Sequence, residues 1–288
     1  MFKNKYAFFL TLPSLAIIFF ISLYPFIYAF YLSLTNAQLT RSNIDFIGIS
    51  NYYSIFRSHD FWIYLQNTGL YTTTATFVEV FLGLAIALLI DAEGVKGKQI
   101  FRTLILLPLM IPPVVGALMW KIMLDPERGP INFILSRFGL SKINWLGSST
   151  MALPTVTLVD IYLFTPFAIL VILAGLQSLP PQVIEASKVD GAGGWKTLRY
   201  IIFPMIQSII LLVILIRLAL TLTSFEIIYV LTKGGPGIST MTLNIQAYTN
   251  FYRYFYSGLA AAYGFILWII IFIITNLLVK KTRQGWEE

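Results

Sequence analysis

The sequence predicts an all-α polytopic membrane protein with six transmembrane helices. Hydrophobic residues make up 57% of the chain and charged residues only 11%, against about 25% charged residues in a typical soluble domain. Six apolar stretches are long enough to cross a bilayer, since a hydrocarbon core of about 30 Å needs about 20 helical residues. Turn-rich segments separate them. These observations predict a single transmembrane domain over residues 1–288.

The first span covers residues 6–35, which carry no charge. Lys3 and Lys5 before it resemble the basic front of a signal peptide. The apolar run is far longer than the roughly 7–15 residues of a signal-peptide core, and no convincing small-residue cleavage site follows it. We therefore expect a retained first helix. The remaining spans cover residues 68–90, 103–124, 151–176, 201–231 and 257–279.

Prolines interrupt several spans, and three of them fall close together in the third span: Pro108, Pro112 and Pro113. Membrane helices tolerate such breaks only where the freed carbonyls face protein or a water-filled cavity. The prolines therefore favour a transporter over a simple anchor. A kinked packing helix is the alternative.

The basic residues predict that both termini are cytoplasmic. On the side of the termini they gather in short segments next to helix ends, where the positive-inside rule holds best. These residues are Lys3, Lys5, Lys96, Lys98, Arg102, Lys188, Lys196, Arg199, Lys280, Lys281 and Arg283. On the opposite side, basic residues are spread over longer loops at 36–60, 125–150 and 232–256. Membrane topology thus explains the net charge of +7, and no nucleic-acid partner is predicted.

Several chemistries are excluded. Without cysteine the chain forms no disulfide, no thiolate nucleophile and no cysteine metal site. The single His59 lies beside Asp60 in a polar loop, where we expect a solvated residue and not a ligand. No G-x-x-x-x-G-K-[ST] motif is present, so ATP and Mg would have to be bound by a separate ATPase. No catalytic residue, metal site or cofactor is predicted in this chain.

The loop between the fourth and fifth spans, residues 178–199, predicts a short cytoplasmic helix. Ser178 is suited to cap it, and Pro181 suits its first turn. The helix should end at Gly191 in the left-handed conformation. Its apolar Val183 would be exposed unless another protein covered it. The loop is therefore expected to dock a partner.

This loop resembles a known family. The signature E-A-A-x-x-D-G-A-(x)n-L-P marks permease subunits of binding-protein-dependent ABC importers. The chain reads Glu185-Ala186-Ser187-Lys188-Val189-Asp190-Gly191-Ala192, closed by Phe203-Pro204. Ser replaces the second Ala and Phe replaces the Leu, and both changes are small. The resemblance implies a type I ABC importer permease-like fold with a cytoplasmic coupling helix. The residues implied to couple to the ATPase are Glu185, Ala186, Ser187, Asp190, Gly191 and Ala192.

A second motif narrows the resemblance. The run Thr232-Lys233-Gly234-Gly235-Pro236 is similar to the L-T-x-G-G-P turn of the first, maltose-type permease subunit of carbohydrate importers. That family implies a second homologous permease subunit, two ATPase subunits or an ATPase dimer, and an extracellular or periplasmic solute-binding protein. It also implies a lipid-embedded chain in the bacterial plasma (inner) membrane.

Four ionisable residues fall inside the spans, where such residues usually face a cavity or a partner. They are Glu79, Asp160, Arg217 and Glu226. Glu79 shares a helix face with Thr72, Thr76 and Gly83, and this face is expected to join helices and not to contact a ligand. On a regular helix Glu226 lies about 180° from Arg217, which excludes a pair between them. Near the outer end of its span, Glu226 is expected to meet a partner subunit or water.

A candidate substrate path follows from the remaining polar positions. Arg217, Thr221 and Ser224 form a stripe on one helix, and Asp160 shares a face with Phe164. By the resemblance, all five match positions that line the sugar site of maltose-type permeases. Hydroxyls, a carboxylate and aromatic faces suit a polyol. The alternative is an Asp160–Arg217 ion pair that only fastens two helices.

The interpretation we favour is the translocation subunit of an ATP-driven importer, with a sugar or oligosaccharide delivered by an external binding protein. An Arg217 that faces the cavity would suit an acidic sugar or sugar phosphate. An Arg217 neutralised by Asp160 would suit a neutral oligosaccharide, which we prefer. A different class, the ion-coupled secondary carrier, would use the same two residues without an ATPase.

Overall fold

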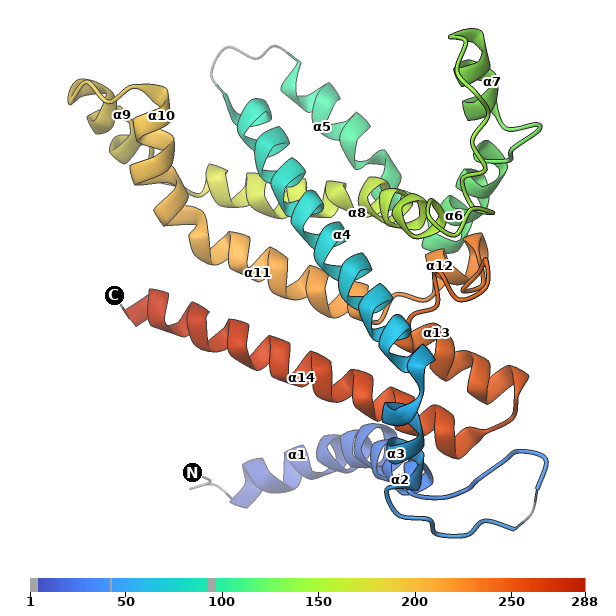
Figure 1. The fold of residues 1–288 in the computed structure, drawn as a ribbon. Helices are drawn as coiled ribbons and strands as arrows, with labels where there is room; N and C mark the ends of the chain where they lie inside the picture. Colours follow the sequence, from blue (N-terminus) through green and yellow to red (C-terminus); the bar gives the residue numbers. More distant parts are fainter. Residues whose placement is uncertain (1–4, 42, 93–96, 288) are drawn as a thin grey trace. The chain divides into compact units, whose positions relative to one another are not determined.

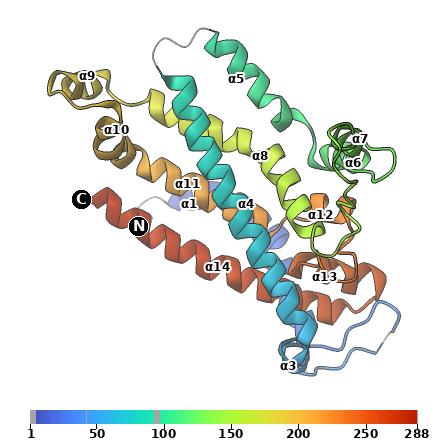
Figure 2. The same cartoon turned by 45° about the horizontal axis from the view of Figure 1, so that its top comes forward.

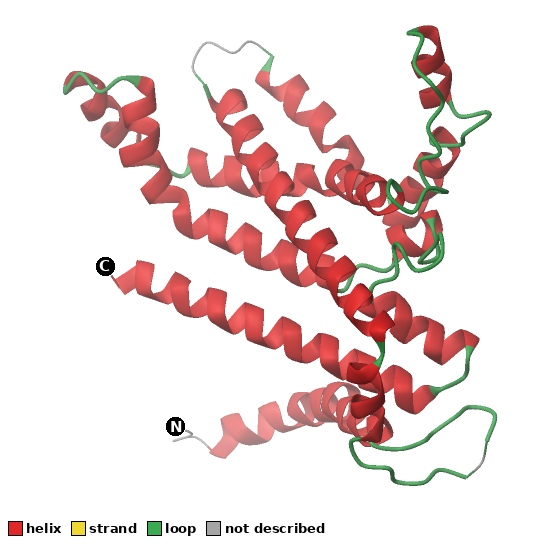
Figure 3. Ribbon diagram, viewed as in Figure 1, coloured by secondary structure: helices red, strands yellow, loops and turns green. Residues whose placement is uncertain are grey.

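A computed structural model describes residues 5–41, 43–92 and 97–287 of the chain. Within these residues the regular structure is helical, and the only strand-like feature is one isolated bridge between Thr35 and Phe46 (Figure 3). The predicted all-α class is confirmed. The chain divides into two compact units, Met1–Trp62 with Gln246–Ile269, and Ile63–Ile245 with Ile270–Glu288. Lys3 and Lys96, used above to predict orientation, lie outside the described residues.

Five helical segments of the described chain are long and apolar enough to cross a membrane, and one bent pair supplies a sixth. The five segments are Leu10–Ser33, His59–Asp91, Ala152–Gln177, Gly194–Leu222 and Ser257–Lys280. The bent pair consists of Lys98–Met110 and Pro113–Met123, which meet at 94°. Each segment overlaps one of the spans expected from the sequence.

The first unit is built on aromatic packing. It contains α1 (Lys5–Ile18), η1 (Phe19–Leu23), α2 (Tyr24–Ser33), α3 (Ser50–Arg57), η4 (Thr249–Arg253) and the start of α14 (Ser257–Glu287). From α2, the rings of Phe26 and Phe30 lie 5.1 and 5.2 Å from the ring of Phe265 on α14. The N–H of Gly258 donates to the carbonyl of Ala37 at 3.0 Å.

The second unit holds the remaining helices. They are most of α4 (His59–Asp91), then α5 (Lys98–Leu106), η2 (Leu107–Met110), α6 (Pro113–Met123), α7 (Pro130–Arg137), α8 (Ala152–Gln177), α9 (Pro181–Val189), α10 (Gly194–Thr197), η3 (Leu198–Ile202), α11 (Phe203–Leu222), α12 (Glu226–Leu231), the start of α13 (Leu243–Tyr248) and the remainder of α14 from Ile270. Figures 1 and 2 both show α9 and α10 at one end of α8 and α11, and α6, α7 and α12 at the other end.

Two apolar clusters form the core of the second unit. One joins α4, α8 and α11 near the α9–α10 end, through Ala87, Ile172, Ile206 and Val213, each with no exposed area. The other joins α4, α6, α8 and α12 at the opposite end, through residues such as Tyr71. Burial of these side chains stabilises the fold in proportion to their apolar area. Polar residues lie where the two clusters meet.

The third span differs from the sequence prediction because it does not cross as one helix over 103–124. Its helix begins at Lys98 and breaks at Ile111, which takes an extended conformation with ψ of 124°. Pro112 follows and Pro113 opens α6. A residue before proline is driven out of the α region, and proline supplies no N–H to the helix ladder. The prolines thus produce a sharp bend rather than a mild kink.

The start of the second span also differs. His59, expected in a loop, is the first residue of α4, and its side chain is exposed. The helix begins nine residues before the predicted position 68, since polar side chains at its first turns stay in contact with water. The sixth span likewise continues as helix beyond residue 279, to Glu287.

Close packing of α4 on α8 depends on Gly83. A Cβ at this position would lie 2.6 Å from the Cβ of Ala168 and 3.2 Å from the backbone carbon of Ala168. Gly69, on the same helix, has no such neighbour within 4 Å. We expect Gly83→Ala to destabilise the protein by about 1–3 kcal/mol through overpacking, although alanine is the better helix former. Thermal unfolding of the full chain in detergent measures the effect.

Gly69→Ala is the matched control. Replacing this glycine with alanine should leave the unfolding temperature unchanged or raise it, because alanine is more favourable than glycine in a helix by up to about 1 kcal/mol. Equal stability of the two variants would contradict the close contact.

Candidate functional site

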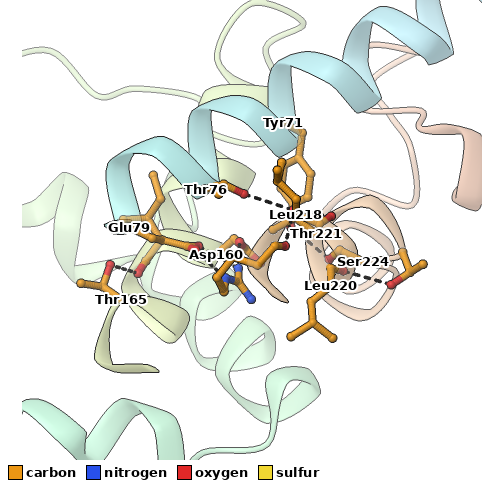
Figure 4. Close-up of polar contacts among 12 residues, drawn as sticks. Tyr71, Thr76, Glu79, Asp160, Thr165, Leu218, Leu220, Thr221 and Ser224 are labelled. Atoms are coloured by element: carbon orange, nitrogen blue, oxygen red, sulfur yellow. Dashed lines mark hydrogen bonds and ion pairs between the residues drawn. The ribbon is translucent and has the colours of Figure 1, made fainter. Parts of the chain in front are cut away.

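A buried ion cluster joins three membrane-spanning helices. Arg217 on α11 donates from Nε and Nη2 to the carboxylate of Glu79 on α4, with 2.8 Å between Nη2 and Oε1. The same Nη2 donates to Oδ2 of Asp160 on α8 at 2.9 Å. The three side chains are at most 1% exposed. Figure 4 shows the Glu79 and Asp160 carboxylates converging from two helices.

Phe164 completes the surroundings of the guanidinium. It lies one helical turn after Asp160, and its ring centroid is 4.2 Å from Cζ of Arg217. A guanidinium over an aromatic face is attracted by the ring quadrupole, more strongly when water is excluded. Arg217 therefore has carboxylates at its edge and an aromatic ring over its face.

Hydroxyl groups extend this network. Thr221 donates to the carbonyl of Arg217 at 2.7 Å and lies 3.4 Å from the hydroxyl of Thr76 on α4. The phenol oxygen of Tyr71 lies 3.0 Å from the hydroxyl of Ser224 (Figure 4). These contacts tie α4 to α11, as the polar face of Glu79 and Thr76 predicts.

The fifth span was predicted as one helix over residues 201–231, but the structure breaks it. The helix starts at Gly194 and ends at Leu222, and α12 begins afresh at Glu226. Thr223 turns its hydroxyl back to the carbonyls of Ala219 and Leu220, both at 3.1 Å. Hydroxyls that bond to the preceding turn compete with a continuous helix.

The backbone groups freed by this break find a partner. The side-chain amide of Asn244 donates to the carbonyl of Thr223 at 2.7 Å and to that of Ser224 at 3.4 Å. Irregular backbone at membrane depth persists only where such partners exist. Because the helix does not continue, the separation of about 180° that a regular helix gives Glu226 and Arg217 does not apply.

All five residues predicted for the substrate path line one cavity of about 230 Å³. The lining residues are Pro113, Asp160, Phe164, Arg217, Leu220, Thr221, Thr223, Ser224, Glu226 and Ile227. Pro113 comes from the bend of the third span, and the stretch from Thr223 to Glu226 comes from the break of the fifth. The cavity thus lies where two membrane spans lose their regular helix. Its lining combines hydroxyls, carboxylates and one aromatic ring.

The short helix predicted in the loop between the fourth and fifth spans is present as α9 (Pro181–Val189). Gly191 after it adopts φ of +76°, the left-handed conformation that was predicted. The N–H of Ala192 donates to the carbonyl of Ser187 at 2.9 Å and closes the turn. Glu185, Ala186 and Asp190 are exposed, as are Val183 and Val189 at 39% and 87%.

Two details of this loop differ from or extend the prediction. Ser178 does not cap α9: its hydroxyl donates to the carbonyl of Gly175 at the end of α8, and Pro180 occupies the cap position. Ser187 is 4% exposed, and its hydroxyl lies 3.3 Å from that of Thr197 on α10. This contact holds α9 against α10.

Sequence reasoning missed the pairing of Glu79 with Arg217 and the place of Glu226 in the cavity. A helical wheel assigns faces within one helix and does not give the depth at which two helices meet. The spacing of hydroxyl residues at 221, 223 and 224 was the available signal for the helix break. Among the described residues, no group of three or more His, Cys, Asp or Glu side chains is placed to hold a metal ion.

Comparisons with known proteins bear on this arrangement. Residues 79–284 match the family described as "Binding-protein-dependent transport system inner membrane component". The chain is 35% identical to a probable ABC transporter permease protein of Sinorhizobium fredii, over 96% of this chain and 89% of the relative. It is 30% identical to the trehalose/maltose transport system permease protein MalF of Thermococcus litoralis, over 98% and 95%. Identity to the trehalose transport system permease protein SugA of Mycobacterium tuberculosis is 31%, over 96% and 89%.

Solved structures show the same fold. A chain of a bacterial ABC transporter involved in the import of the acidic polysaccharide alginate superposes with a TM-score of 0.85 at 23% identity, over 98% of this chain and 96% of that one. A chain of the MetNI methionine ABC transporter gives a TM-score of 0.55 at 18% identity, over 76% and 93%.

Removal of the cation from the ion cluster should destabilise the protein strongly. Arg217→Met leaves Glu79 and Asp160 buried without their partner, which costs about 3–5 kcal/mol. Adding Glu79→Gln and Asp160→Asn should recover most of that loss, because no unpaired charge then stays buried. Denaturant unfolding of the full chain in detergent measures both variants.

The exposed Lys142–Glu127 pair, at 2.6 Å with side chains 49% and 77% exposed, is the control. Lys142→Ala should change stability by under about 1 kcal/mol. A similar loss for Arg217→Met and Lys142→Ala would contradict the importance of the buried cluster.

Proposed function

Because the chain belongs to the family of binding-protein-dependent transport system inner membrane components, we propose that it is the translocation subunit of an importer for a sugar or oligosaccharide. Family membership makes it a non-catalytic ABC transporter permease of the inner membrane. Such a permease works with a binding protein and with an ATPase on other chains.

The cavity carries the assignment to sugars. Thr223, Ser224 and Glu226 offer hydroxyl and carboxylate groups to substrate hydroxyls, and Phe164 offers an apolar ring. Carbohydrate sites combine such directed hydrogen bonds with apolar contact. The relatives named for trehalose and maltose transport support the same substrate class. We propose that Asp160 and Arg217 hold the cavity walls in place.

We propose that a second, homologous permease completes the pathway. Leu220, in the cavity lining, is 52% exposed. Outside the lining, the stacked rings of Phe77 and Phe81 on α4 are 72% and 62% exposed. Exposed aromatic residues on membrane helices pack against lipid or another subunit. ATP and Mg would be bound by two partner ATPase subunits, and the substrate would arrive on an external binding protein.

The orientation we propose places both termini in the cytoplasm of a bacterial cell. In the second unit, the segments with Lys98, Lys188, Lys196 and Arg199 lie at the α9–α10 end (Figure 1). A concentration of basic residues marks the cytoplasmic side. This end then faces the ATPase.

Energy from ATP would reach the cavity through α9. The exposed face with Glu185 and Asp190 is the surface we propose to dock on the ATPase, together with Ala186, Gly191 and Ala192. Ser187 is buried against α10 and holds the element together. From α9 and α10, α8 and α11 lead to Asp160 and Arg217, so a displacement at the loop is transmitted to the cavity wall.

Proteoliposomes with the binding protein, both permeases and the ATPase test this function. We expect ATP-dependent uptake of a neutral sugar from a panel of di- to tetrasaccharides. Glu185→Ala and Gly191→Val should each lower uptake at least tenfold while ATP hydrolysis by the ATPase continues. The valine variant acts because β-branched residues are strained at positive φ.

Gly193→Ala is the control, because Gly193 has negative φ and no heavy atom within 4 Å of an added Cβ. It should transport normally. Normal uptake by both Glu185→Ala and Gly191→Val would refute the coupling role. Uptake by the chain without its ATPase would identify an ion-coupled carrier instead.

A further inference from the structure

We infer that the cavity admits uncharged sugars and rejects anionic ones, and that Glu226 is the residue that determines this preference. The inference rests on the proposed function and adds the charge of the substrate. It concerns a residue that lies outside the predicted substrate path, at the first position of α12.

Arg217 is not available to an anionic substrate, although it is a cation in the cavity wall. Two of its nitrogens, Nε and Nη2, already donate to Glu79 and Asp160. Phe164 covers one face, and only 1% of the side chain is exposed. The bidentate pair with Glu79 is among the strongest hydrogen-bonded pairs in proteins. A substrate carboxylate or phosphate could reach only what is left of the guanidinium, whose charge is already matched by two carboxylates.

The charges around the cavity favour neutral ligands. One cation, Arg217, stands against the carboxyl groups of Glu79, Asp160 and Glu226. The ammonium of Lys121, on α6, donates to the carbonyl of Val230 at the other end of α12, and Lys121 does not line the cavity. The ion cluster is therefore not positive, and Glu226 adds a further negative group. Like charges in a confined site repel each other more strongly than they do in bulk water.

Glu226 is the one carboxyl group of the three that is accessible to a substrate. Glu79 and Asp160 are buried in the ion cluster, whereas Glu226 is exposed and lines the cavity. A carboxylate accepts hydrogen bonds at two oxygens, which matches two neighbouring hydroxyls of a sugar. Thr223 and Ser224 place hydroxyls in the same lining. Glu226 thus binds a polyol and repels a sugar acid at one position.

Similarity to the alginate importer does not decide the substrate charge. At 23% identity the likeness shows the fold, and the charges of this cavity are set by its own residues. A fold shared with an importer of an acidic polysaccharide is compatible with a cavity that selects neutral sugars, since function depends on the site.

A matched pair of sugars tests the inference in the assembled transporter. One is a neutral disaccharide that the wild type takes up, with trehalose and maltose tried first. The other is the same disaccharide with a primary alcohol oxidised to a carboxylate. Uptake of each is divided by the measured occupancy of the binding protein, which removes the selectivity of that protein.

We expect the wild type to take up the acid at least tenfold more slowly than the neutral sugar. Glu226→Gln should raise the ratio of acid to neutral uptake about tenfold, since it removes the charge and keeps the shape. Glu127→Gln, an exposed carboxylate outside the cavity, should leave the ratio unchanged.

An equal rate for both sugars in the wild type would overturn the inference, as would an unchanged ratio in Glu226→Gln. If Glu226→Gln abolished all uptake, Glu226→Asp would decide: retained uptake with retained discrimination supports a role of the charge, and loss of uptake overturns it. A wild type that takes up no neutral sugar from the panel, with its binding protein loaded, would instead refute the proposed function.

Discussion

A guanidinium group that is almost entirely buried must be neutralised by the protein itself, because an unpaired buried charge is costly. Arg217 satisfies this requirement with one carboxylate from α4 and one from α8. The pairing fixes the depth at which three helices meet, and the two apolar clusters pack on either side of it. Apolar packing alone allows helices to slide along each other, whereas a buried ion pair requires one register. The cavity depends on that register, since two of its lining residues, Asp160 and Arg217, belong to the ion cluster.

The two irregular membrane spans contribute to the same place. Prolines bend the third span, and hydroxyl residues end the fifth span early; Pro113 and Glu226 come from these breaks and line one cavity. A continuous helix can contribute only the side chains on its surface to a cavity. A broken one also brings loop residues to membrane depth, as in other transporters. Asn244 makes the second break tolerable because it binds the carbonyls that the helix leaves free.

Local patterns in the sequence were enough for the number of spans, the helix of the coupling loop and the left-handed Gly191. Local patterns also gave the polar stripe of Arg217, Thr221 and Ser224 and the shared face of Asp160 and Phe164, whereas the resemblance to maltose-type permeases grouped these five residues; a pair between Asp160 and Arg217 was one alternative. The patterns did not reveal that Glu79 binds the same guanidinium, since contact between helices depends on relative depth and rotation. The place of Glu226 was missed because a regular helix was assumed through Thr223. The predicted cap at Ser178 was wrong because that hydroxyl bonds to its own preceding helix.

The contact between Ser187 and Thr197 closes a path through the second unit. Backbone runs from Asp160 along α8 into α9, returns through α10 and η3, and reaches Arg217 along α11. The hydroxyl contact closes this path at one end and the Asp160–Arg217 ion pair closes it at the other. These helical segments therefore form a closed arrangement that is joined at both ends. One contact joins α9 to α10 and the other joins α8 to α11, so the loop helix α9 and the cavity residues Asp160 and Arg217 belong to one closed structure.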